Sequence, residues 1–173
     1  MFNFTPEASS IIHVPYFDDV SRDEGWQGYS TTKPTKKLQA EIGDAIGRLG
    51  GIVSSFQRGT FIIDNQTRAG YRVHYSIQNP NTRLVLGRID VAALPVRNKR
   101  DETRKDKSLR MALYMLRNAL DGMWFMQQLS PGYAALMPWM LADGDRTVSQ
   151  LWSDSPIMSN LLPPPDSEFV IDG

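Results

Sequence analysis

The longest periodic apolar segment of the chain lies at residues 108–129. Its large apolar side chains recur every three or four residues, which predicts an amphipathic helix. The members of this repeat are Leu109, Leu113, Leu116, Leu120 and Met123. Because Met115, Trp124 and Phe125 widen the apolar stripe, we expect the helix to be covered on most sides by the rest of the domain or by a second copy of the chain. A homo-oligomer is therefore expected.

An earlier helix is predicted at residues 35–51, where apolar residues again fall on one side. These positions are Leu38, Ile42, Ile46 and Leu49. Thr35 is expected to be the N-cap of this helix. Gly50–Gly51 supplies the left-handed residue that ends it.

Three strand-like segments lie between the two helices, at residues 52–63, 71–77 and 82–94. The first segment forms either one long strand with a bulge at Arg58–Gly59 or a tight hairpin. A turn is expected at residues 64–70, before the second segment begins.

The second strand alternates strictly between two faces. One face carries Tyr71, Val73, Tyr75 and Ile77, and the other carries Arg72, His74 and Ser76. Gly87, in the middle of the third strand, is expected at a further bulge. Short turns between successive strands predict an antiparallel meander, which needs a layer of helix on one face. The predicted fold class is therefore α+β: a helix, a three-stranded antiparallel meander, a long helix and a C-terminal capping segment.

The chain divides into three predicted regions. Residues 1–32 form an irregular acidic arm, residues 33–152 the α+β domain, and residues 153–173 a proline-rich acidic tail. Trp26 and Tyr29 are expected to pin the arm to the domain or to a partner. No secretory signal and no apolar run of membrane-spanning length is present, and there are no cysteines, so a cytoplasmic protein without membrane contact is expected.

Charge is distributed unevenly along a chain whose net charge is zero. Residues 1–32 carry a net charge of −4, residues 33–117 carry +10, and residues 118–173 carry −6. This pattern indicates an electropositive surface with acidic flanks that stay off it or compete for it. The alternative interpretation is that surface charge is simply uneven.

Enzymatic function is the less favoured interpretation. The two histidines, His13 and His74, are far apart in sequence and form no metal-binding motif. No phosphate-binding loop and no GxSxG motif occurs. A metal-dependent nuclease would use Asp64 and Asp90, but the acid-x-Lys pair that this chemistry requires is missing. No catalytic residue, metal ligand or cofactor is predicted.

The meander and the run that follows it interleave basic and aromatic side chains. Residues 58–110 hold 12 basic and five acidic side chains. Sites for single-stranded nucleic acid combine cations that contact phosphates with rings that stack on bases. The predicted nucleic-acid-binding residues are Arg58, Phe61, Tyr71, Arg72, His74, Arg83, Arg88, Arg97, Lys99, Arg100, Arg104 and Lys105.

Two alternatives stay open for these residues. Tyr71 and Tyr75 alternate with Arg72 and His74, so the tyrosines can simply belong to the core. Residues 97–107 contain three acids that reduce their net charge to +3, and such a run is often a solvated connection into a helix.

The leading hypothesis is a non-enzymatic nucleic-acid-binding protein that favours single-stranded DNA. Its acidic C-terminal tail would compete for the binding groove or recruit a partner protein. The alternative is a protein-interaction adaptor or inhibitor that acts through the apolar helix 108–129 and the tails. A metal-dependent nuclease is the third hypothesis.

The order of several motifs carries a resemblance to a known family. These motifs are Leu49-Gly50-Gly51, GRIDVAALP (Gly87 to Pro95), PWMLADGDRTVSQLW (Pro138 to Trp152) and LLPPP (Leu161 to Pro165). Over residues 35–165 the chain resembles uncharacterised small proteins of bacteriophages and bacterial mobile elements. It departs from their pattern at Ala142, where proline is usual, and at Asp145, an extra residue. The resemblance implies a setting in which DNA replication and recombination proteins are common, and it supplies no catalytic residues.

Overall fold

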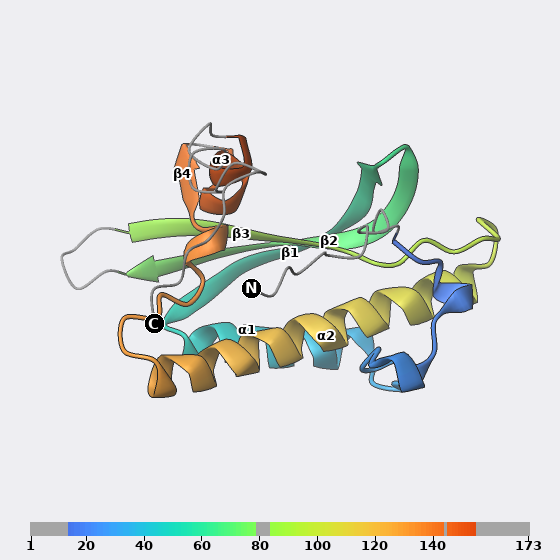
Figure 1. Cartoon of the computed structure of the whole chain (residues 1–173), viewed down its shortest axis with the longest axis horizontal. Helices are drawn as coiled ribbons and strands as arrows, with labels where there is room; N and C mark the ends of the chain where they lie inside the picture. The colour runs from blue at the N-terminus through green and yellow to red at the C-terminus, as the bar shows by residue number, and fades with distance from the viewer. Residues whose placement is uncertain (1–13, 79–83, 144, 155–173) are drawn as a thin grey trace, which may run out of the picture.

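A three-stranded antiparallel sheet covered by two helices forms the centre of the molecule (Figure 1). This computed structural model describes residues 14–78, 84–143 and 145–154. The central elements are α1 (Thr35–Arg48), β1 (Gly51–Ile63), β2 (Gln66–Gln78), β3 (Leu84–Ala92) and α2 (Glu102–Leu129). The strand order is β1-β2-β3, with both pairs antiparallel. The predicted α+β class and meander are confirmed.

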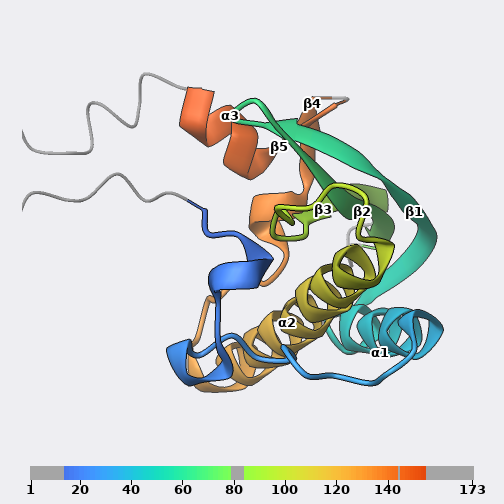
Figure 2. The same cartoon turned by 90° about the vertical axis from the view of Figure 1, so that its right-hand side faces the viewer.

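The segment after α2 forms a small module, whose elements are η3 (Met137–Trp139), β4 (Leu141–Asp143), β5 (Arg146–Thr147) and α3 (Val148–Asp154). The module begins with Trp139 packed against the core and ends with β4 and α3 on the side of the sheet opposite the helices (Figure 1). A bridge between Gly87 and Met140 joins this module to β3. We call these residues the C-terminal module, and they form the predicted capping segment. Figures 1 and 2 show that the hairpin end of β1 and β2 also rises on this side.

The predicted N-cap of α1 is wrong by one residue. Thr35 is the first residue of the helix, and Pro34 occupies the N-cap position with extended dihedral angles. Proline suits this position because its fixed φ is compatible with the chain's entry into a helix. At the other end, Gly50 has a φ of 90°, which confirms the predicted left-handed residue.

The β1–β2 hairpin is longer than the sequence pattern predicted. β1 is one strand, and its register shifts between Val53 and Ser55 rather than at the predicted Arg58–Gly59. The turn is only Asp64–Asn65, both with positive φ, so the turn predicted at residues 64–70 is wrong. Asp and Asn tolerate the left-handed conformation, which allows a two-residue turn to close the hairpin.

The core has two parts. In the first, α1, α2 and the helix-facing side of the sheet bury a continuous apolar cluster that includes Leu38, Tyr75 and Leu113. In the second, the N-terminal arm packs Phe17 and Val20 against α2, with Trp26 and Tyr29 beside them. The arm is thus held on the domain, as expected from its two large aromatic residues.

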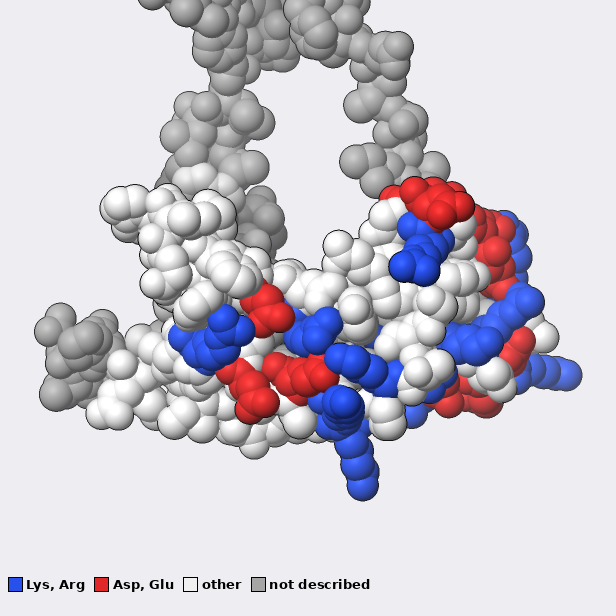
Figure 3. Space-filling view, turned by 90° about the horizontal axis from the view of Figure 1, so that it is seen from below, with Lys and Arg blue, Asp and Glu red and all other residues white. Residues whose placement is uncertain are grey.

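The apolar helix is covered along most of its length by α1, the sheet and the arm. Its C-terminal end is not: Phe125, Met126 and Leu129 are exposed, Leu129 to 77%. Figure 3 shows uncharged residues over this end and charges of both signs over the rest of the helix layer. Self-association through α2 stays a prediction. Within the described ranges, no helix has the length and apolar character needed to cross a membrane.

Candidate nucleic-acid interface

The open face of the sheet carries the predicted basic residues of β2 and β3. The register places His74 opposite Arg88 and Arg72 opposite Asp90. Arg72 donates two hydrogen bonds to the carboxylate of Asp90, at 2.7 Å and 3.0 Å. These bonds raise the pKa of Arg72. The structure therefore brings the predicted cations together, but with an acid among them.

Arg88 holds the C-terminal module rather than facing solvent. Its Nε lies 3.2 Å from Asp90 Oδ2, and Nη1 donates to the backbone oxygen of Asp145 at 2.6 Å. Nη2 donates to Oε1 of Gln150 at 3.1 Å. The side chain is 11% exposed, so little of it remains for a ligand. His74, its neighbour, shares a hydrogen bond of 3.0 Å with the Ser55 hydroxyl.

The two predicted stacking residues are not presented as a platform. Tyr71 is 5% exposed and belongs to the core, because it points to the helix side of β2. A buried ring cannot stack on a base, so the prediction of Tyr71 as a stacking residue is wrong. Phe61 is partly buried, and a Cβ at Gly70 would lie 2.5 Å from its ring. Phe61 therefore covers the backbone of the neighbouring strand.

One further predicted residue, Arg58, lies away from the open face. The register pairs Arg58 with Tyr71, which puts Arg58 on the helix side of the sheet. There its Nη2 lies 3.3 Å from Oδ1 of Asp106 on α2. Arg83 lies outside the described residues.

The remaining predicted cations gather where α2 begins. The helix starts at Glu102, earlier than residue 108, because the Asp101 side chain accepts the backbone N–H of Arg104 at 3.0 Å. Arg104 and Lys105 are therefore on the first turns of the helix. Lys105 lies 2.9 Å from Glu102. This run therefore neutralises part of its own charge.

The acidic turn of the N-terminal arm pairs with two of these cations. Arg97 is ion-paired with Asp19, and Arg104 with Asp18. The backbone N–H of Arg97 also donates to Asp18 at 3.0 Å, and this bond is the main reason that the pKa of Asp18 is lowered. The guanidinium of Arg97 stacks on Tyr16 at 4.5 Å. The acidic flank thus occupies part of the basic surface.

One pocket opens between the basic connection and the β1–β2 hairpin. It has a volume of about 400 Å³. The cations at its wall are Arg97, Lys99 and Lys105, and Gln66 and Thr67 face them from β2. Three predicted binding residues therefore line one pocket, whose wall also includes the apolar residues Leu94, Pro95 and Val96.

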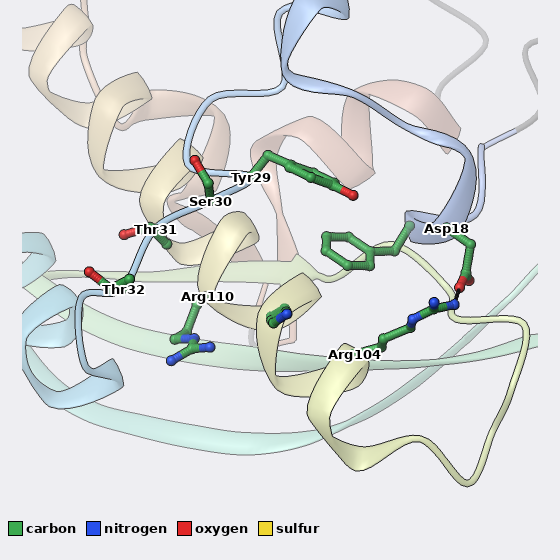
Figure 4. Close-up of a pocket in the computed structure, with 9 residues that line it drawn as sticks. Asp18, Tyr29, Ser30, Thr31, Thr32, Arg104 and Arg110 are labelled. Carbon is green, nitrogen blue, oxygen red and sulfur yellow. Dashed lines mark hydrogen bonds and ion pairs between the residues drawn. The ribbon is translucent and has the colours of Figure 1, made fainter.

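A second pocket, of about 510 Å³, lies between the arm and α2. Its cations are Arg104, Lys107 and Arg110, and the arm contributes residues 29–32 (Figure 4). Lys107 and Arg110 were missed as site residues. The available signal was the three-residue step from Arg104 to Lys107 and again to Arg110, which places all three on one side of a helix.

The residues considered for metal-dependent chemistry do not form a site. Asp64 lies in the hairpin turn, whereas Asp90 faces Arg72. Asp64 lies just before β2 begins at Gln66, and Asp90 pairs with Arg72 further along the same strand. At roughly 3.3 Å per residue, Gln66 and Arg72 are about 20 Å apart, so the two acids are far from each other. In the part of the chain that is described, no three histidine, aspartate or glutamate side chains are grouped to hold a metal ion.

Comparison of the chain with protein-family models, curated proteins and solved structures found no match. The resemblance to proteins of bacteriophages and mobile elements stays a prediction. The geometry favours one region as the candidate interface: the start of α2 with its two flanking pockets. We call this region the α2 entry surface. It is formed by the exposed Arg100 and by the pocket-lining cations Arg97, Lys99, Arg104, Lys105, Lys107 and Arg110.

Proposed function

We propose that the chain is a non-enzymatic nucleic-acid-binding protein that favours single-stranded DNA and binds it along the α2 entry surface. The observation that carries this proposal is the pair of cation-lined pockets on either side of the acidic turn at Asp18 and Asp19. A strand of phosphates running from one pocket to the other would meet Arg97 and Arg104 at that turn, where both are ion-paired with its acids. The setting in phage or mobile-element DNA metabolism is part of the same proposal.

The balance of free and paired cations favours the α2 entry surface over the sheet. On the sheet, Arg72 and Arg88 share Asp90. At the start of α2, Lys99 and Arg100 are exposed, and their side chains have no ion-pair partner among the described residues. Free cations contact phosphate without first losing an internal partner. Each phosphate contact releases counterions, so binding is expected to weaken as salt rises.

Fluorescence polarisation with a labelled single-stranded oligonucleotide at several salt concentrations tests this proposal. Arg100→Gln is expected to weaken binding and to reduce the slope of log K against log salt by about 0.7, the value for one phosphate contact. Arg48→Gln makes the same chemical change near Trp124, towards the other end of α2, and should leave the slope unchanged. Absence of binding at low salt would overturn the proposal, as would equal effects of the two variants.

A protein-interaction adaptor is the second candidate function. It is favoured by the exposed apolar residues Phe125, Met126 and Leu129 at the end of α2, since clustered apolar side chains on a surface mark interaction sites. This candidate predicts no affinity for nucleic acid and a defined protein partner that Leu129→Ser fails to bind. Sedimentation of the wild type and of Leu129→Ser would show whether that partner is a second copy of the chain.

A further inference from the structure

The pocket between the arm and α2 has the features of a site for a phosphorylated ligand. We propose that it binds the phosphate monoester of a nucleotide, either free or at the 5′ end of a strand. The inference deepens the proposed function and rests on it for the strand-bound case. It concerns Lys107 and Arg110, which the sequence pattern did not assign to the site.

The three cations of this pocket lie on successive turns of α2. Arg104 is ion-paired with Asp18, but Lys107 and Arg110 have no hydrogen-bond or ion-pair partner among the described residues. The Nε atom of Arg110 is buried and bonds to no acceptor there. A buried donor without an acceptor is unfavourable, and a bound anion would satisfy it.

The charge of the cavity suits a dianion. Asp18 is the only acid among the described residues of its wall, and Figure 4 shows Arg104 turned toward it, away from Arg110. Asp18 also accepts the backbone N–H of Arg97 at 3.0 Å. Its charge is therefore compensated inside the protein, and two cations remain for a ligand. A phosphate monoester carries a charge between −1.5 and −2 at neutral pH, and a phosphate within a strand carries only one.

The size of the cavity indicates a ligand larger than phosphate. Its volume of about 510 Å³ lies within the range of about 300–1,000 Å³ that is usual for small-molecule sites. The ring of Tyr29 borders it (Figure 4) and is held against Phe17 at a centroid distance of 5.2 Å. A nucleoside attached to the phosphate would contact this fixed aromatic wall.

The test compares two forms of one 3′-labelled single-stranded oligonucleotide, with a 5′ phosphate or a 5′ hydroxyl, by fluorescence polarisation. The wild type is expected to bind the phosphorylated form at least about tenfold more tightly, as two charge-assisted contacts allow. Lys107→Gln and Arg110→Gln should remove this preference. Lys99→Gln and Arg100→Gln, matched changes outside the pocket between the arm and α2, should weaken both forms equally. Thermal unfolding checks that each variant is folded, and exposed Lys107 provides a variant that leaves the core untouched.

The outcomes separate the inference from the proposed function. Equal binding of both oligonucleotides would overturn the inference and leave the proposed function standing. Binding of adenosine monophosphate but not adenosine, with no binding of either oligonucleotide, would support a free-nucleotide site and overturn the proposed function. Failure of all these ligands to bind would overturn both. A preference for the 5′ phosphate that survives in both Lys107→Gln and Arg110→Gln would place the phosphate elsewhere and overturn the inference.

Discussion

Two glycines in the sheet are positions where a neighbouring aromatic ring lies across the backbone. A Cβ at Gly87 would lie 2.1 Å from Cζ of Tyr75, and a Cβ at Gly70 would lie 2.5 Å from the ring of Phe61. The pairing of β2 with β3 continues through Gly87 without a register shift, so the bulge predicted there is wrong. A glycine in a strand marks either a bulge or a close approach, and Gly87 is a close approach.

Substitution of Gly87 should therefore be destabilising. We expect Gly87→Ala to lower the free energy of unfolding by about 3 kcal/mol, at the upper end of overpacking effects, because the ring of Tyr75 is buried and its hydroxyl bonds to Leu136 at 3.2 Å. Gly59→Ala is the matched control, since a Cβ there meets no atom within 4 Å. Urea unfolding of both variants measures the difference. Similar stability of the two variants would contradict this account of Gly87.

Among the elements, α2 shows which features an apolar repeat predicts and which features it leaves undetermined. The apolar repeat predicted the helix because burial of one side imposes a period near 3.6. The same repeat could not locate the first turn, which is polar and depends on the cap at Asp101. Nor could it show that Asp18 and Asp19 pair with cations about 80 residues away in sequence. The strand faces were predicted because alternation encodes burial, whereas the ionic partners of the cations depend on tertiary contacts.

One side chain of β3, Arg88, adds to the Gly87–Met140 bridge in holding the C-terminal module. Arg88 donates to the backbone of Asp145 and to Gln150, so Arg88→Gln should loosen residues 145–154 from the sheet. We expect hydrogen exchange there to quicken by about tenfold, the effect of losing roughly 1–2 kcal/mol of charge-assisted bonding. Arg72→Gln, on the same face, should leave exchange in the module unchanged. If Arg88→Gln instead weakens oligonucleotide binding while exchange in the module stays at the wild-type rate, Arg88 contacts the ligand as first predicted.

At the scale of the whole molecule, ionic contacts tie the N-terminal arm to the domain. Glu41 of α1 accepts from Lys33, the residue directly after the arm, at 2.8 Å and from Arg117 of α2 at 3.0 Å. At the other end of the arm, Asp18 pairs with Arg104. The arm forms one wall of the pocket between the arm and α2. Two ionised carboxylates therefore add to the apolar contacts of Phe17 and Val20 that hold this wall in place.

Low pH should weaken the ionic contacts of Glu41 and Asp18 within a defined range. The hydrogen bond from Lys33 is the main cause that lowers the pKa of Glu41 below its ordinary 4.5, and the pKa of Asp18 is lowered below 3.8. A carboxylate with a lowered folded-state pKa contributes stability above its unfolded pKa and loses it as pH falls through the folded value. We therefore expect unfolding free energy to hold down to about pH 5 and to fall below it, while exchange in residues 14–33 quickens.

Glu41→Gln isolates one of these carboxylates. The variant should lose about 1–2 kcal/mol at neutral pH, and its stability should fall less steeply than that of the wild type below about pH 4.5. Asp44→Asn is the matched control on α1, because Asp44 is exposed and has no ion pair among the described residues. Urea unfolding across this pH range gives the dependence of unfolding free energy on pH for the wild type and for each variant. A Glu41→Gln variant as steep as the wild type would mean that Glu41 does not hold the arm, and the pocket beside it would then have to be maintained by the apolar contacts of Phe17 and Val20.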